Sequence, residues 1–119
     1  MIRVIVLLFF GALLSACGNS SDTGTLALSA VKDGAVLIDV RTAEEFASGH
    51  LSGAINIPHG EIIEGIAELD VSQSTDIVLY CRSGNRSGIA TTSLSEAGFS
   101  KAMNAGAYST LKPLWDAGN

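Results

Sequence analysis

Positive charge is scarce in this chain of 119 residues, where seven lysines and arginines stand against twelve aspartates and glutamates, a formal net charge of −5. An acidic surface repels the phosphate backbone, so the composition argues against a nucleic-acid-binding protein. Internal repeats and low-complexity tracts are also missing. A single domain is therefore expected.

Long apolar runs are missing as well. The longest, Val4 to Leu14, has eleven residues, whereas a helix that spans a bilayer needs about 20. The run follows the cation Arg3, and a positive residue before a short apolar stretch is typical of a secretory signal peptide. Residues 1–16 are expected to be such a signal.

The expected signal is followed directly by a cysteine. The tetrapeptide Leu14-Ser15-Ala16-Cys17 resembles the lipobox of bacterial lipoproteins, in which the signal is cut before the cysteine and that cysteine carries lipid. The resemblance implies an exported protein anchored through Cys17 on the periplasmic side of a membrane. Gly18 resembles the residue found at this position in outer-membrane lipoproteins. The alternative is a plain signal peptide with an incidental cysteine.

Residues 17–24 are expected to form a lipidated, flexible polar tether, and residues 25–119 the domain. A lipid on Cys17 leaves Cys81 as the only thiol of the mature chain. No disulfide can then form within the chain. A redox cycle that ends in an internal disulfide is excluded too, because there is no resolving cysteine.

The stretch around Cys81 carries the candidate chemistry. Residues 77–80 are a β-branched and aromatic run, typical of a strand buried on both faces of a parallel sheet. Cys81 would then lie at the strand's carboxyl end, where open α/β sheets bind ligands. Gly84 and Asn85 tolerate positive φ and favour a tight curl into a helix. Such a curl aims several backbone N–H groups at one anion.

Cys81 is the candidate for that anion. A thiol at a helix N-terminus beside cations has its pKa lowered from about 8.5 to between about 3.5 and 7.5, and Arg82 and Arg86 supply the cations. The pattern predicts a nucleophilic thiolate at neutral pH. The alternative is that Cys81 is a small buried hydrophobe. Separately, Arg82 or Arg86 could be an ordinary solvated charge.

Strands and helices are expected to alternate after the tether. The periodicity predicts strands at 35–40, 77–80 and 102–104, and a turn followed by a short strand within 50–58. It predicts helices at 43–48, 60–69, 86–97 and 108–115, and a weak first element at 25–34. Ile63 and Ile89 are expected to face the core with the other apolar residues of their helices. This alternation implies a parallel α/β sheet with helices on both faces.

Several segments, in the right order, resemble those of one known family. The matching residues are 39–46, 49–58, 80–87, 96–99 and 104–106. They resemble the two signatures, active-site loop and C-terminal motifs of the rhodanese (sulfurtransferase) family, above all its small exported phage-shock-type thiosulfate sulfurtransferases. The resemblance implies a five-stranded parallel sheet flanked by helices on both faces, and a cysteine that carries sulfur as a persulfide. No cofactor is expected.

The resemblance also assigns roles to residues. Cys81 would accept the sulfur, and the persulfide cradle would be built from Arg82, Ser83, Gly84, Asn85, Arg86 and Ser87. Arg82 and Arg86 match a loop pattern associated with thiosulfate-type donors, and a thiolate approaches a dianion only where fixed positive charge offsets the repulsion. The implied activity moves sulfur from a small anionic donor such as thiosulfate to a nucleophile such as cyanide or a thiol.

Three further signature residues are interpreted as structural. Asp39 and Arg41 follow the first strand, and Arg41 is expected to pair with Glu45. His50 is expected to be a turn residue with a satisfied ring. His59 has no companion at ligand spacing, so no metal site is expected.

Two other functions fit parts of the pattern. Cysteine phosphatases resemble Cys-(five residues)-Arg, but here Ser87 occupies the arginine's position and Arg86 comes one residue early. A loop shortened in this way suits one sulfur atom better than a tetrahedral oxyanion. The other alternative is a lipoprotein that uses a rhodanese-like domain only to bind a partner, because fold alone never proves activity.

Overall fold

A computed structural model describes residues 20–119 of the chain. The expected signal peptide and Cys17 lie outside the described residues. Four strands form one parallel sheet in the order β2-β1-β3-β4, with bounds β1 Val36–Asp39, β2 Ile55–Asn56, β3 Ile77–Cys81 and β4 Ala102–Ala107. The parallel α/β architecture expected from the sequence is confirmed.

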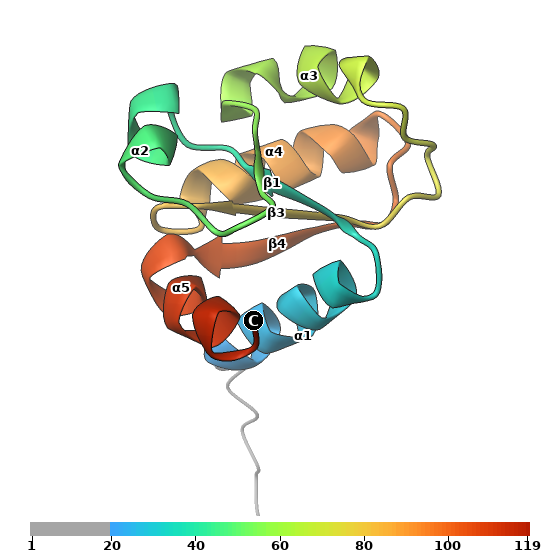
Figure 1. Ribbon diagram of the computed structural model, residues 1–119. Helices are drawn as coiled ribbons and strands as arrows, with labels where there is room; N and C mark the ends of the chain where they lie inside the picture. The colour runs from blue at the N-terminus through green and yellow to red at the C-terminus, as the bar shows by residue number, and fades with distance from the viewer. Residues whose placement is uncertain (1–19) are drawn as a thin grey trace, which may run out of the picture.

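Helices cover both faces of the sheet, as the family resemblance implies (Figure 1). Their bounds are α1 Ser20–Lys32, α2 Ala43–Ser48, the 3₁₀ helix η1 His59–Glu61, α3 Ile62–Glu68, α4 Asn85–Glu96 and α5 Tyr108–Ala117. In Figure 1, α2, α3 and α4 lie on one side of the sheet and α1 and α5 on the other. No helix within residues 20–119 is long and apolar enough to cross a membrane.

The expectation of a five-stranded sheet is wrong for residues 20–119, where the sheet has four strands. The segment before β1 is helical instead. Ala27 and Leu28 of α1 are buried against the sheet while Leu26 is 72% exposed, a pattern of helical period. α1 therefore covers a face of the sheet and adds no strand.

The expected tether is too long, because α1 begins at Ser20, within residues 17–24. Gly24 packs so closely on α5 that an added Cβ would lie 2.9 Å from the Leu111 Cδ2 atom. The small polar residues of this stretch are typical of a linker, but they also let two helices approach. Residues 20–24 are thus part of the domain.

The strand β3 separates two apolar layers, and its side chains alternate between them. Ile77, Leu79 and Cys81 belong to the layer under α3 and α4, whereas Val78 and Tyr80 belong to the layer under α1 and α5. All five residues are buried. The thiol therefore lies on the α4 side of the sheet, at the carboxyl end of a central strand.

The prediction that Ile63 and Ile89 face the core is wrong. Ile63 is 41% exposed and Ile89 is 52% exposed. Ile63 follows the buried Ile62, and Ile89 precedes the buried Ala90. Adjacent residues of a helix point about 100° apart around its axis, so neither side chain faces the sheet. In these helices a narrow stripe of residues four apart, such as Ala90 and Leu94 in α4, contacts the sheet.

Candidate active site

The loop after β3 curls around the sulfur of Cys81, as the sequence predicts. The Gly84 N–H donates a hydrogen bond to Sγ at 3.0 Å, and the Ser87 hydroxyl donates to it at 3.3 Å. Gly84 has φ of +93° and is the N-cap of α4. A Cβ there would also lie 3.3 Å from Gly106 Cα, so both its conformation and the close approach of β4 favour glycine.

Cys81 is a free cysteine without exposed surface. Burial raises the pKa of this thiol, but hydrogen bonds from the Ser87 hydroxyl and from the backbone of Ser87, Ser83 and Gly84 outweigh it and lower the pKa below its ordinary value. A cysteine that served only as a small hydrophobe would lack these donors. The geometry therefore favours a thiolate over a packing cysteine.

The two loop arginines contribute less to that thiolate than expected, because hydrogen bonds are the main cause of the lowered pKa. Arg86 faces Glu45 on α2, with Nη1 to Oε1 at 2.6 Å and Nη2 to Oε2 at 3.0 Å. This ion pair raises the pKa of Arg86. Arg82 is exposed.

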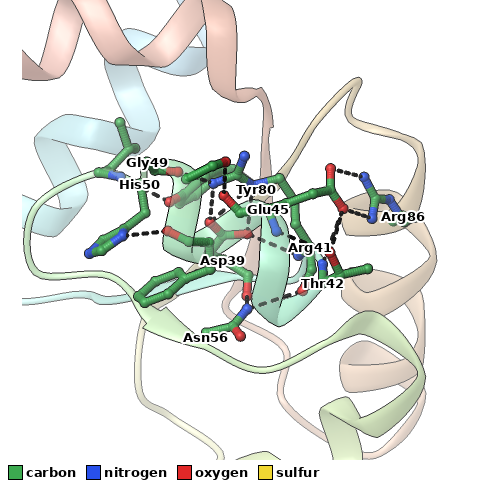
Figure 2. Close-up of polar contacts among 12 residues, drawn as sticks. Asp39, Arg41, Thr42, Glu45, Gly49, His50, Asn56, Tyr80 and Arg86 are labelled. Atoms are coloured by element: carbon green, nitrogen blue, oxygen red, sulfur yellow. Dashed lines mark hydrogen bonds and ion pairs between the residues drawn. The ribbon is translucent and has the colours of Figure 1, made fainter.

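The partner predicted for Glu45 is thus wrong: it is Arg86, not Arg41 (Figure 2). The hydrogen bond from Arg86 is the main cause that lowers the pKa of Glu45 to about 2. Glu45 also completes a capping box with Thr42 at the start of α2. One carboxylate therefore both caps α2 and connects it to α4.

Arg41 pairs instead with Asp39 in a buried contact. The guanidinium Nε lies 3.0 Å from both carboxylate oxygens, and Nη2 lies 2.7 Å from Oδ2 and donates to the Gly49 carbonyl at 2.6 Å. Residues two apart in an extended segment share a face, a signal that could have identified this pair. Arg41 locks the β1–α2 connection, in agreement with its structural interpretation.

His50 lies in the loop after α2 and has the satisfied ring that the sequence predicts. Its ring stacks on Phe46 with centroids 3.7 Å apart, and its Nδ1 lies 2.9 Å from the Phe46 carbonyl oxygen (Figure 2). Within residues 20–119 no group of three acidic, histidine or cysteine side chains is arranged to hold a metal ion.

Two surface hollows flank the Cys81 loop. One of about 510 Å³ is lined by Arg41, Glu45, Ser48, Arg82, Tyr108 and Ser109. The other, about 530 Å³, is lined by Gly84, Asn85, Gly88, Ile89, Thr92 and Ser93. The first is the better candidate for an anionic substrate because it is lined by Arg82, which forms no ion pair among residues 20–119, whereas its other arginine, Arg41, is already paired with Asp39.

Sequence reasoning missed one residue of the site. Asn104 on β4 contacts the loop through hydrogen bonds with Gly84 and Ser87. Its position within the matched segment 104–106 gave no hint of that role. A polar side chain in the expected last strand was the available signal, because a side-chain amide that is even partly buried needs hydrogen-bond partners.

A lone hydrogen-bonded thiol at the carboxyl end of a parallel strand, beside a helix N-terminus, is an arrangement typical of α/β proteins that use a cysteine nucleophile. Residues 23–109 match the family model described as a rhodanese-like domain. The chain belongs to the rhodanese-like family, as its resemblance to that family implies.

Several curated relatives carry sulfurtransferase names. The chain is 42% identical over 69 residues to thiosulfate sulfurtransferase PspE of Escherichia coli, a match that covers 58% of this chain and 66% of that protein. It is 38% identical over 91 residues to the chloroplastic thiosulfate sulfurtransferase 16 of Arabidopsis thaliana, covering 67% and 75%. These similarities support sulfurtransferase activity of the rhodanese type, with a sulfur donor and an acceptor.

Solved structures agree with the family assignment. A rhodanese with anions from Escherichia coli has a TM-score of 0.62 at 38% identity, covering 65% of this chain and 91% of that one. The human single-domain sulfurtransferase TSTD1 has a TM-score of 0.62 at 28% identity, covering 74% and 89%.

Proposed function

We propose that this protein moves sulfane sulfur from thiosulfate, or a similar small anionic donor, to cyanide or a thiol acceptor through a persulfide on Cys81. One observation carries the proposal: the only cysteine of residues 20–119 accepts hydrogen bonds at Sγ from a backbone N–H and a buried hydroxyl at the start of α4. Those donors stabilise a thiolate, which is the reactive form.

The first half-reaction loads the sulfur. The Cys81 thiolate attacks the outer sulfur of thiosulfate, a new S–S bond forms, and the donor's S–S bond breaks with its electron pair leaving on sulfite. The terminal sulfur of the persulfide then carries the negative charge. Backbone N–H groups of residues 82–87 stabilise this charge in the cradle.

The second half-reaction unloads the sulfur. A nucleophile attacks the terminal sulfur, and the Cys81 thiolate leaves with the electrons of the persulfide bond. Cyanide would leave as thiocyanate, and a thiol would leave as a persulfide. Because sulfite departs before the acceptor reacts, the kinetics are ping-pong.

The burial of Cys81 and the charge around it determine how a sulfur donor reaches the thiol. Since Cys81 has no exposed surface, a donor reaches Sγ only when the loop residues above it move aside. Among residues 20–119, no ion pair involves the Arg82 side chain, and it lines the 510 Å³ hollow with Arg41. Arg82 is therefore the cation best placed to meet a dianion first.

Two observations favour this function over the alternatives. A cysteine phosphatase needs its loop arginine turned toward the bound oxyanion, whereas Arg86 is engaged by Glu45. A domain that only binds a partner has no need of a thiol with a lowered pKa.

For localisation, we infer that the protein is exported and anchored through lipid on Cys17, on the periplasmic side of a bacterial membrane and preferentially the outer one. The support is the segment Leu14 to Gly18 in the sequence. Several acyl chains on one residue hold a protein firmly, whereas a single chain binds only marginally.

The decisive experiment is an intact-mass measurement after incubation with thiosulfate. The purified protein is expected to gain the mass of one sulfur atom, to lose it on addition of cyanide, and to release thiocyanate. The matched variant Cys81→Ser keeps the size and the hydrogen bonding of the side chain but not the nucleophile, so it is expected to gain nothing. Undiminished thiocyanate formation by Cys81→Ser would remove the assignment.

A further inference from the structure

The side chain of Asn104 contacts two residues, Gly84 and Ser87, that donate hydrogen bonds to Cys81. Its Oδ1 accepts a hydrogen bond from the Ser87 hydroxyl at 2.7 Å and one from the Gly106 N–H at 3.0 Å. Its Nδ2 donates to the Gly84 carbonyl at 2.9 Å. The Gly84 N–H and the Ser87 hydroxyl are among the groups that donate to Sγ.

An irregularity in β4 allows this contact. Leu79 of β3 pairs with Asn104, but the next residue, Tyr80, pairs with Gly106, so Ala105 is an extra residue in β4. Gly106 has φ of +100°. Such bulges re-aim side chains beside active sites. Here the Gly106 N–H is folded back onto Asn104 Oδ1 and holds the side chain in place.

The Ser87 hydroxyl has one proton and two acceptors within reach. Oδ1 of Asn104 is at 2.7 Å and Sγ of Cys81 at 3.3 Å. Ser87 is fully buried, so it has no exposed surface at which water could serve as a further partner. When Cys81 is a neutral thiol, the Ser87 hydroxyl donates its hydrogen bond to Oδ1 of Asn104. The S–H group of Cys81 can then donate to the Ser87 oxygen.

The proton's best position changes when the thiol ionises. A thiolate is a charged acceptor, and hydrogen bonds to charged groups are stronger than those between neutral ones. The Ser87 hydroxyl then turns toward Sγ. Oδ1 of Asn104 still accepts the hydrogen bond from the Gly106 N–H, so it is not left without a donor.

We propose that Asn104 is a positioning residue that sets how readily Cys81 ionises, by competing for the single Ser87 proton and by fixing Gly84 at the start of α4. The inference rests on the proposed function only in treating the Cys81 thiolate as the reacting form. Asn104 itself does not touch the substrate.

Charged groups lie on the elements around the Cys81 loop. Arg86 of α4 interacts electrostatically with Cys81 and is paired with Glu45 of α2. Arg82 is an exposed residue of the loop itself, and Asp39 pairs with Arg41 after β1. The hydrogen-bond partners of Asn104 are all uncharged. Its influence on Cys81 is therefore separable from theirs by substitution.

The test is the pH dependence of Cys81 alkylation by iodoacetamide, followed by intact mass. Asn104→Asp keeps the shape and Oδ1 but makes the acceptor an anion that holds the Ser87 proton more strongly. We expect the midpoint of the alkylation profile to rise, with alkylation about tenfold slower near neutral pH, which corresponds to about one pKa unit. Thermal unfolding of each variant verifies that the fold persists.

A double-mutant cycle separates the proposed route from a simple charge effect. In a Ser87→Ala background, Asn104→Asp can act only through its charge and the Gly84 contact, so its effect on the rate is expected to fall by more than half. An unchanged midpoint in the single variant, or an equal shift in both backgrounds, would overturn the proposal.

A measurement on the wild-type protein keeps the proposal testable if Asn104→Asp does not fold. The side-chain amide NMR resonances of Asn104 are expected to titrate with the midpoint of Cys81 alkylation, and to move less than half as far in Ser87→Ala. Amide resonances of Asn104 that do not shift as Cys81 titrates would refute the proposal. Alkylation needs no sulfur donor, so a protein that fails to transfer sulfur but shows this coupling contradicts only the proposed function.

Discussion

At the scale of single residues, the site depends on which charges are already paired. Both arginines of the loop could be counted from the sequence, but not their partners. Glu45 holds Arg86 with two hydrogen bonds, and its pKa of about 2 keeps it ionised at any pH used for an assay. The cationic field that meets a donor is therefore weaker than two arginines imply.

Glu45→Gln is expected to strengthen thiosulfate binding. Glutamine keeps the capping box of α2 but removes the charge that offsets Arg86. The KM for thiosulfate is expected to fall about threefold, or roughly 0.7 kcal/mol, with little change for a neutral donor. Steady-state kinetics with both donors measure the difference.

Glu44→Gln is the matched control for that variant. Glu44 lies in the same first turn of α2, and its replacement removes the same charge without touching the Arg86 ion pair. An equal fall in KM for Glu44→Gln would show that net charge, and not the release of Arg86, is responsible.

At the scale of elements, the sequence predicted most of the chain after residue 34. The apolar runs that became β1 and β3, the capping box of α2 and the curl at Gly84 all depend on neighbouring residues, so they can be recognised locally. The Asn104 contact could not be predicted in this way. It joins residues 17 and 20 positions apart across a strand irregularity that has no sequence signature.

The helix α1 was not predicted with its observed bounds, because its first turns are rich in serine, threonine and glycine. Tertiary packing decides its fold, since Leu28 is buried on the sheet face shared with α5. Helices of this length gain most of their stability from such packing rather than from propensity.

Leu28→Ala tests whether α1 is an integral part of the domain. Removing this buried side chain, which is 4% exposed, is expected to lower the free energy of unfolding by about 2–4 kcal/mol. Leu26→Ala, at a position 72% exposed on the same helix, is the control and should change it by less than about 0.5 kcal/mol. Urea denaturation of both variants gives the values, and equal small effects would place α1 outside the cooperative unit.

At the scale of the whole molecule, the described domain and the expected anchor are closely spaced. α1 begins three residues after Cys17, a stretch that reaches at most about 10 Å even when fully extended. A lipid on Cys17 would therefore hold the domain against the membrane surface, closer than a tether of residues 17–24 would.

Cys17→Ser tests this arrangement in the full chain. Wild-type protein extracted from membranes is expected to show an intact mass increased by acyl chains, whereas the variant carries no lipid and leaves the membrane fraction, because it lacks the residue that is acylated. Sulfur loading of Cys81 is expected to be equal in both, since Cys17 lies before the segment 23–109 that matches the family. Wild-type protein without lipid would refute the anchor, and a loss of sulfur loading in Cys17→Ser would show that the N-terminal segment reaches the active site.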